Sequence, residues 1–185
     1  MTTQALLIVD MQNDYFEGGK FPLSGTDAAA AKSAEILAAF RAAGKPVIHI
    51  RHEILSKPAP FFEPATQGAE IHSSVAPVNG EPVITKNFPN SFRDTDLQDQ
   101  LQALGITDLV IIGAMSNMCI DATTRAATDL GYGCSVAHDA CAATDLEFDG
   151  VAVPAAQVHA GFMAALAMGY GAILPTDQVI AGLSD

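Results

Sequence analysis

Short apolar runs alternate along the chain with longer segments in which apolar residues recur at helical spacing. Six runs have the length and the continuous apolar character of buried strands. The expected strands are residues 5–10, 45–51, 81–86, 107–113, 133–139 and 171–175. Four longer segments are typical of helices, and each ends at or just before a glycine, which often terminates a helix. The expected helices are residues 26–44, 95–105, 119–130 and 154–168.

This alternation predicts a doubly wound α/β fold, with a mainly parallel six-stranded sheet and helices on both faces. Neither a repeat nor a linker interrupts the pattern, so residues 1–185 are expected to form a single domain. Residues 52–80 lack clear periodicity and contain four prolines. A long loop of this kind is either a tolerated surface excursion or a lid that covers a substrate.

The composition argues against two kinds of partner. Of the 185 residues, 49% are hydrophobic, and the formal net charge is -12. Nucleic acids and anionic membranes attract clustered Lys and Arg, so neither is expected to bind this chain. Residues 151–176 carry no charged side chain, but proline and glycine residues interrupt them. They predict a buried helix and a strand rather than a membrane span.

Cysteine usage and the N-terminal stretch both favour the cytoplasm. The three cysteines are Cys119, Cys134 and Cys141, an odd number without a C-x-x-C pair. This pattern supports neither a disulfide framework nor a zinc site, and it is typical of a reducing compartment. The first residues, "MTTQALLIVDMQNDY", lack a basic region and are interrupted by Asp10, which does not fit a signal peptide.

Reactive residues occur where several of the expected strands end. Ligands of open parallel sheets bind beyond the carboxyl ends of the strands. Asp10 ends the first strand, Lys86 ends the third, and Cys119 lies beyond the fourth at the start of a helix. His138 and Asp139 end the fifth.

Each of the first three residues has a purely structural interpretation, as a turn cap, a solvated strand end or a packed thiol. Together they also form a set with chemistry, because a carboxylate can accept a thiol proton while a cation and a helix N-terminus favour the thiolate. The loop "GAMSNM" before Cys119 can turn backbone N–H groups toward a developing oxyanion.

Three motifs carry a resemblance to a known family. "LLIVDMQNDYF", "VITKNFPNSF" and "VIIGAMSNMCIDATTRAATDLGY", with "GAEIH" and "DACAATD" beside them, resemble the isochorismatase-like, or cysteine hydrolase, superfamily over nearly the whole chain. The resemblance implies a doubly wound hydrolase domain over residues 1–185 and a catalytic triad of Asp10, Lys86 and Cys119. It also implies a cis peptide bond between Ala114 and Met115, and an oxyanion hole formed by the backbone N–H groups of Met115 and Cys119.

The chain departs from the nicotinamidases of this superfamily at their metal site. Arg51 stands where their Asp-x-His motif has its aspartate, and no carboxylate at the required spacing accompanies His49, His52 and His72. A metal needs several converging ligands, so we expect no metal, no other cofactor and no activity on nicotinamide. True isochorismatases cleave a vinyl ether without a thiol, whereas Cys119 points to hydrolysis of a C–N bond.

The sequence therefore predicts a cysteine-dependent hydrolase that cleaves an amide, carbamoyl or lactam bond of a small molecule through a thioester. Asp10 is expected to take the thiol proton and Lys86 to stabilise negative charge. The candidate substrate-binding residues are Phe16, Phe92 and Asn117. A homo-oligomer, either a dimer or a tetramer, is also expected.

Other readings stay open. One is a vinyl ether hydrolase of the isochorismatase type. Another is a flavodoxin-like binding protein, although the acidic loop "DMQNDYFEGG" would repel a phosphate. An aspartate-dependent phosphatase would normally carry a second aspartate where this chain has Gln12. The last alternative is a non-catalytic protein that keeps the scaffold.

Overall fold

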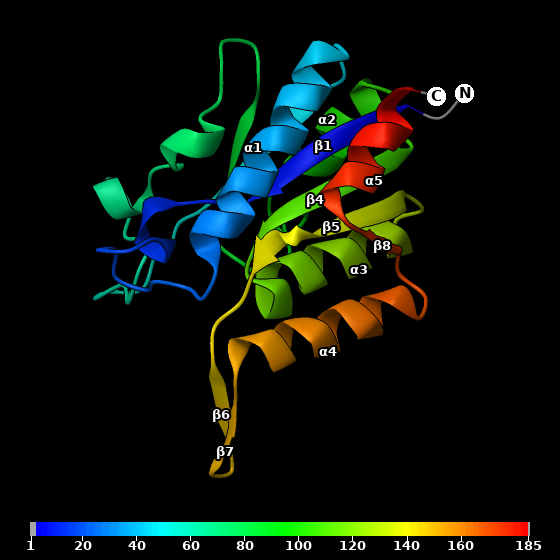
Figure 1. Ribbon diagram of the computed structural model, residues 1–185. Coiled ribbons are helices and arrows are strands. Elements are labelled where there is room, and N and C mark those ends of the chain that lie inside the picture. The colour runs from blue at the N-terminus through cyan, green and yellow to red at the C-terminus, as the bar shows by residue number, and fades with distance from the viewer. Residues whose placement is uncertain (1–2, 185) are drawn as a thin grey trace.

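Six parallel strands form one sheet in the order β3-β2-β1-β4-β5-β8 (Figure 1). The computed structural model describes residues 3–184. The strands are β1 (Gln4–Val9), β2 (Val47–His52), β3 (Val83–Lys86), β4 (Asp108–Ala114), β5 (Gly133–Ala142) and β8 (Ala172–Leu174). The central strands β1 and β4 are almost completely buried, which explains their uninterrupted apolar sequences.

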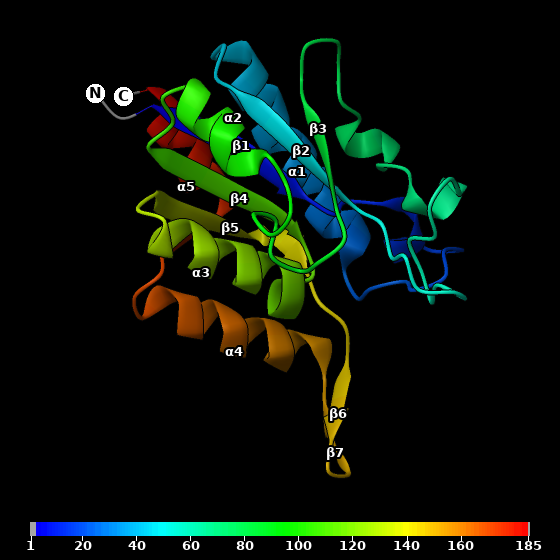
Figure 2. The ribbon, with the colours of Figure 1, turned by 180° about the vertical axis from the view of Figure 1, so that it is seen from behind.

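Helices cover both faces of this sheet (Figures 1 and 2). Helices α1 (Thr26–Ala42) and α5 (Thr176–Ala181) pack on one face. The other face is covered by α2 (Leu97–Ala103), α3 (Asp121–Asp129) and α4 (Ala155–Ala167). The predicted fold class, a doubly wound α/β fold, is confirmed.

The strand order reverses between β1 and β4. The chain places β2 and β3 on one side of β1 and then crosses over to place β4 on the other side. A crevice beyond the carboxyl ends of the strands at such a switch point is where doubly wound folds bind ligands. Asp10 directly follows β1, and the segment that carries Cys119 directly follows β4, so both residues flank the switch point.

Strand β5 is longer than the sequence predicts. It continues to Ala142, and its register with β4 shifts between Ile111 and Gly113. The prediction that His138 and Asp139 end this strand was therefore wrong. Asp139 instead accepts hydrogen bonds from the N–H and hydroxyl groups of Thr176, at 2.9 and 2.8 Å, at the start of α5.

The long connection between β2 and β3 folds onto the loop after β1. It contains two short 3-10 helices, Gln67–Ala69 and Ser73–Val75. Asp14, from the 3-10 helix Asn13–Tyr15, accepts a 2.6 Å hydrogen bond from the N–H of Phe62. The ring of Phe62 is fully buried with its centroid 4.5 Å from that of Tyr15. This connection is thus held beside the carboxyl edge of the sheet.

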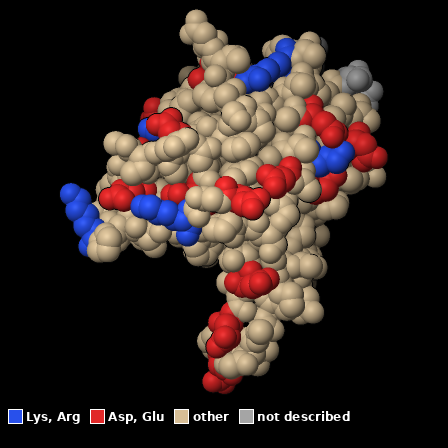
Figure 3. All heavy atoms as spheres, turned by 60° about the vertical axis from the view of Figure 1, so that its left-hand side comes forward, with Lys and Arg blue, Asp and Glu red and all other residues tan. Residues whose placement is uncertain are grey.

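A two-stranded antiparallel hairpin projects from the body of the molecule (Figures 1 and 2). It consists of β6 (Leu146–Phe148) and β7 (Val151–Val153), and it leads from β5 to α4. The sequence did not predict it, because three-residue strands are too short to show a period. Acidic side chains follow this projection in the space-filling view (Figure 3).

Helix α5 and a 3-10 turn at Gly182–Ser184 complete the described chain. Within residues 3–184, no helix has both the length and the apolar character needed to cross a membrane.

Candidate active site

An ion pair between Asp10 and Lys86 lies at the carboxyl edge of the sheet. Asp10 leaves β1 with a left-handed backbone conformation, φ 52°, which aspartate tolerates better than most residues. Lys86 is the last residue of β3, and its Nζ lies 2.7 Å from Oδ2 of Asp10. Nζ also donates a 3.1 Å hydrogen bond to the carbonyl oxygen of Pro89. Both side chains are shielded from solvent completely.

Cys119 lies in a π-helical turn, Ser116–Ile120, that continues into α3. The sequence predicts a helix beginning at Cys119, but the helical backbone begins three residues earlier. The thiol is therefore held inside a turn, where it is only 3% exposed. The peptide bond between Ala114 and Met115 is cis, as the resemblance implies.

Hydrogen bonds within and around this turn fix its shape. The N–H groups of Met118 and Ile120 both donate to the carbonyl oxygen of Met115 at 3.1 Å. The hydroxyl of Ser116 donates to the carbonyl oxygen of Ala142 at 3.1 Å and lies 2.8 Å from Nδ1 of His159. The turn is thus attached to β5 and to α4 as well as to itself.

Gly113 allows β1 and β4 to approach closely just before the turn. Its φ is 125°, and a Cβ atom there would overlap the carbonyl oxygen of Val9. Only glycine combines this backbone conformation with this lack of space. The close approach brings the start of the Cys119 turn next to Asp10, which follows Val9 directly.

His52 joins the three predicted residues. It is the last residue of β2 and pairs in register with Lys86. Its Nδ1 lies 3.6 Å from Oδ2 of Asp10 and 3.8 Å from Sγ of Cys119. Sequence reasoning treated His52 only as a possible metal ligand, because it placed the end of β2 one residue too early.

The charges around this cluster are strongly coupled. Burial raises the pKa of Asp10, but Lys86 and His52 lower it, and the net pKa lies below the ordinary aspartate value. Burial lowers the pKa of Lys86, but Asp10 and Cys119 raise it above the ordinary value. Burial and then the Asp10 carboxylate raise the pKa of the Cys119 thiol well above its usual range, although Lys86 opposes them. The resting site therefore holds a carboxylate, an ammonium and a protonated thiol.

The remaining candidate residues lie at different depths. Phe16 is buried and stacks on His72 with ring centroids 3.6 Å apart. Phe92 is half-buried and packs against the core cluster that includes Cys119. Asn117 is buried in the Cys119 turn, and its Oδ1 is buried without a hydrogen-bond partner among the described residues. An amide held in this way can receive a hydrogen bond from a ligand.

Asp10, His52 and Cys119 also offer one potential metal ligand each, and these three atoms lie within 4.8 Å of one another. Oxygen, nitrogen and sulfur donors of this kind suit zinc. The ammonium of Lys86 lies 2.7 Å from the carboxylate, however, and it would repel a metal cation. The cluster is better suited to stabilise an anion that forms beside Lys86.

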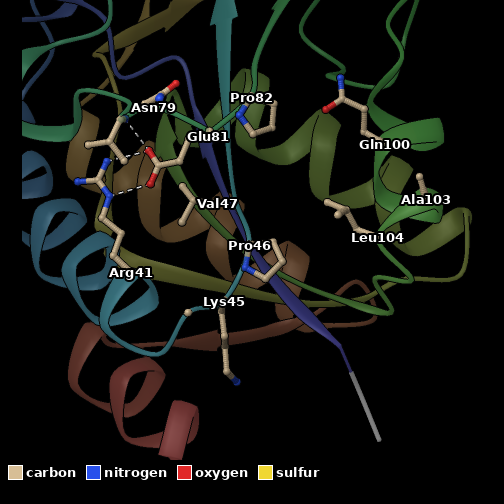
Figure 4. Close-up of a pocket in the computed structure, with 13 residues that line it drawn as sticks. Arg41, Lys45, Pro46, Val47, Asn79, Glu81, Pro82, Gln100, Ala103 and Leu104 are labelled. Atoms are coloured by element: carbon tan, nitrogen blue, oxygen red, sulfur yellow. Dashed lines mark hydrogen bonds and ion pairs between the residues drawn. The ribbon is translucent and has the colours of Figure 1, made fainter.

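A cavity of about 780 Å³ lies at the opposite, amino edge of the sheet (Figure 4). Its wall includes Arg41 and Glu81, whose side chains point toward one another, while Gln100 of α2 and Leu104, just after α2, line the far side. None of the predicted catalytic residues lines it. This cavity therefore does not mark the reactive groups.

A buried thiol, carboxylate and ammonium thus lie together at the switch point of a doubly wound sheet, where folds of this class bind ligands. A model of the isochorismatase domain matches residues 4–168. The chain belongs to the isochorismatase family of hydrolases.

Individual relatives agree with this assignment. The isochorismatase family protein YddQ of Bacillus subtilis is 49% identical over 178 residues, which cover 96% of this chain and 99% of YddQ. The ureidoacrylate amidohydrolase RutB of Rhizobium rhizogenes is 30% identical over 161 residues, or 69% of this chain and 65% of RutB. The crystal structure of an isochorismatase hydrolase from Oleispira antarctica has a TM-score of 0.95 and 58% identity, and the match covers 98% of this chain and 97% of that one.

Proposed function

We propose that this hydrolase cleaves a C–N bond of a small amide-type molecule, with Cys119 as the nucleophile. The observation that carries the proposal is the convergence of Asp10, Lys86 and Cys119 from three separate elements into one buried cluster. A buried ion pair beside a thiol is costly to maintain and adds little to stability, so a catalytic use is a reason to keep it. The similarity to an amidohydrolase supports the choice of a C–N bond.

The proposed reaction has two steps. Asp10 takes the proton of Cys119, and the thiolate attacks the carbonyl carbon to give a tetrahedral intermediate. The N–H groups of Met115 and Cys119 bind its oxyanion. The intermediate collapses to a thioester as protonated Asp10 gives its proton to the leaving amine. Water, deprotonated by Asp10, then hydrolyses the thioester and restores the thiol.

The same charges explain how the thiolate could form. Proton transfer from the thiol to Asp10 moves the negative charge from the carboxylate to the sulfur without changing the net charge of the cluster. Lys86 contacts Asp10 and lowers the pKa of Cys119, so it remains close to the negative charge throughout. This arrangement limits the electrostatic cost of the transfer inside a buried site. Phe16, Phe92 and Asn117 are the residues that we propose for substrate recognition.

An ammonia-release assay over primary amides, carbamoyl compounds and lactams tests this function. We expect at least one class to release ammonia or amine with the wild type, and no release with Cys119→Ala. Cys134→Ala is the matched control, because Cys134 contacts Thr124 and Tyr132 rather than the cluster. Amide hydrolysis that survives Cys119→Ala would exclude the thiol mechanism, whereas a wild type that hydrolyses none of the three classes would favour a vinyl ether hydrolase.

We also propose that the chain self-associates through the projecting hairpin. Cross-strand pairs place Leu146, Phe148, Val151 and Val153 on one face, and Phe148 is 84% exposed. This apolar face continues into a groove of about 280 Å³ between the base of the hairpin and α4. A two-stranded hairpin is marginal by itself, and an exposed apolar surface of this kind usually has a partner. Two copies related by a two-fold axis can cover both features at once.

Light scattering coupled to size-exclusion chromatography tests the association. We expect an oligomer for the wild type and a smaller species for Phe148→Ser. Leu104→Ser instead removes an exposed apolar side chain just after α2 and should leave the mass unchanged. A monomeric wild type, or a Phe148→Ser protein of unchanged mass, would contradict the proposal.

A further inference from the structure

His52 occupies a position between the two atoms that exchange a proton in the proposed reaction. Its Nδ1 lies 3.6 Å from Oδ2 of Asp10 and 3.8 Å from Sγ of Cys119. The first distance is too long for a full hydrogen bond, whereas the second is within the range of a weak contact to sulfur. Catalytic hydrogen bonds are often long before a substrate binds. In the resting site the imidazole therefore makes a strong hydrogen bond to neither Oδ2 of Asp10 nor Sγ of Cys119.

The backbone of His52 is held firmly in this position. The buried amide of Gln12 accepts a 2.7 Å hydrogen bond from the N–H of His52 and donates a 2.8 Å bond to its carbonyl oxygen. The same amide donates a second 2.8 Å bond to the carbonyl oxygen of Ala69. The side-chain amide of Gln12 thus pairs with both backbone polar groups of His52, as a neighbouring strand would. It fixes the site from which the imidazole extends over the cluster.

Each element around the imidazole contributes one group that faces it. They are Asp10 after β1, Lys86 at the end of β3, Cys119 in the π-helical turn, and Phe62 from the long connection, whose ring centroid lies 6.1 Å away. Tyr15 packs on Phe62 with ring centroids 4.5 Å apart, and burial together with the charges of Cys119 and Asp10 raises its pKa well above the ordinary value, so it stays neutral. Within residues 3–184, Asp10 is the only acidic side chain with an oxygen within 4.0 Å of an imidazole nitrogen, and the Cys119 thiolate would be a second anion beside it once formed.

We propose that His52 is a further catalytic residue, whose Nδ1–H group stabilises whichever of Asp10 and Cys119 carries the negative charge. The proton moves from Sγ to the carboxylate, and the charge moves the opposite way. The Nδ1–H group stays in place and strengthens its hydrogen bond to the sulfur as the thiolate forms. His52 neither gains nor loses a proton in this step, so the transfer remains balanced between the thiol and Asp10.

This inference rests on the proposed role of Cys119 as nucleophile, but it can be tested without a substrate. The rate at which iodoacetamide alkylates Cys119, followed by peptide mass spectrometry from pH 5 to pH 10, reports how readily the thiolate forms. Cys134 in the same sample is an internal control, because it lies outside the cluster.

Three variants separate the possible roles of the imidazole. His52→Leu keeps much of the volume but removes the N–H donor, and a hydrogen bond to a charged group is worth roughly a 10- to 100-fold effect. We expect its Cys119 alkylation at pH 7 to slow by that factor and its profile to move to higher pH. His52→Asn places an amide N–H close to the position of Nδ1 and should restore most of the rate. His52→Gln places its amide nearer to Nε2, and should behave like His52→Leu while preserving polarity and folding.

Two results would overturn the proposal. If the leucine and glutamine variants fold and their Cys119 profiles superimpose on that of the wild type, His52 has only a structural role. If the asparagine variant is as slow as the leucine variant, His52 does not act through an Nδ1–H donor. Failure of the proposed function is a separate outcome, because amide hydrolysis by Cys119→Ala would show it whatever the alkylation profiles are.

Discussion

Strand β2 carries two histidines, and each lies beside an acid that also binds a cation, at a different edge of the sheet. His49 Nε2 lies 2.9 Å from Oε2 of Glu81, which also binds Arg41 in the wall of the amino-edge cavity. His52 Nδ1 lies 3.6 Å from Oδ2 of Asp10, which also binds Lys86 at the carboxyl edge. The two clusters thus have the same types of group and differ in how those groups are connected.

The cluster at the amino edge satisfies its carboxylate completely. Arg41 donates to both oxygens of Glu81 at 2.8 Å, and His49 Nε2 and the N–H of Val78 lie 2.9 and 3.0 Å from Oε2. Asp10, by contrast, accepts no hydrogen bond from a backbone N–H group within residues 3–184. A fully hydrogen-bonded carboxylate is held in one state, whereas one that contacts only an ammonium, a thiol and an imidazole can exchange a proton. We interpret the first cluster as structural and the second as catalytic.

The largest expected contrast is in activity. Asp10→Asn should lower kcat/KM by about 10²–10⁴-fold, because it removes the proposed general base. Glu81→Gln should leave kcat/KM unchanged, since the amino-edge cluster lies away from the thiol. Both variants are compared with the amide found in the ammonia-release assay. Equal losses in the two variants would remove the functional distinction between the clusters.

The next contrast is in stability, and its sign should differ between the clusters. Arg41→Met with Glu81→Gln should lower the free energy of unfolding by about 1–3 kcal/mol, because charge-assisted hydrogen bonds are lost. Asp10→Asn with Lys86→Met removes a buried ion pair, a change that is often neutral or stabilising by about 1–4 kcal/mol.

Urea denaturation measures both double variants. The result is informative only if their m-values match that of the wild type, since a changed m-value signals a different unfolded or native state. A clear loss of stability in the Asp10–Lys86 double variant, equal to that of the Arg41–Glu81 variant, would show that both pairs are structural.

The smallest contrast is in the acid dependence of stability. The hydrogen bond from Arg41 lowers the pKa of Glu81 from 4.5 to about 2 in the folded protein. An acid with a depressed pKa stabilises the fold above its unfolded value, and that contribution disappears as the pH falls. The wild type should therefore lose stability between about pH 4.5 and pH 2, and the Arg41→Met/Glu81→Gln variant should lose less over the same range. Parallel curves of unfolding free energy against pH would contradict this role of Glu81.

Much of the carboxyl-edge site was predictable, because a single rule locates it. Strand periodicity finds the ends of β1 and β3, and the rule that ligands bind beyond strand ends then selects Asp10 and Lys86. The same rule did not select His52, because the sequence predicts that β2 ends at residue 51, one residue before its actual end at His52. Element ends are the least certain part of any pattern, and here one residue decides whether a side chain joins the site.

Three other features could not be predicted from the sequence pattern. The π-helical turn around Cys119 differs from an α-helical start only in its hydrogen bonds, which a period of 3.6 residues does not reveal. The hairpin of β6 and β7 has too few residues for a strand period. The side-chain hydrogen bonds of Gln12 reach segments 40 and 57 residues away, which local patterns do not encode.

Mass spectrometry of the enzyme during turnover tests the central claim most directly. After rapid acid quenching with the responsive amide, the peptide containing Cys119 should gain the mass of the acyl group, and hydroxylamine should remove that mass as expected for a thioester. Cys119→Ala should show neither the adduct nor turnover. Full hydrolytic activity without an adduct on Cys119, or with the adduct on another residue, would contradict the assignment of this buried thiol as the nucleophile.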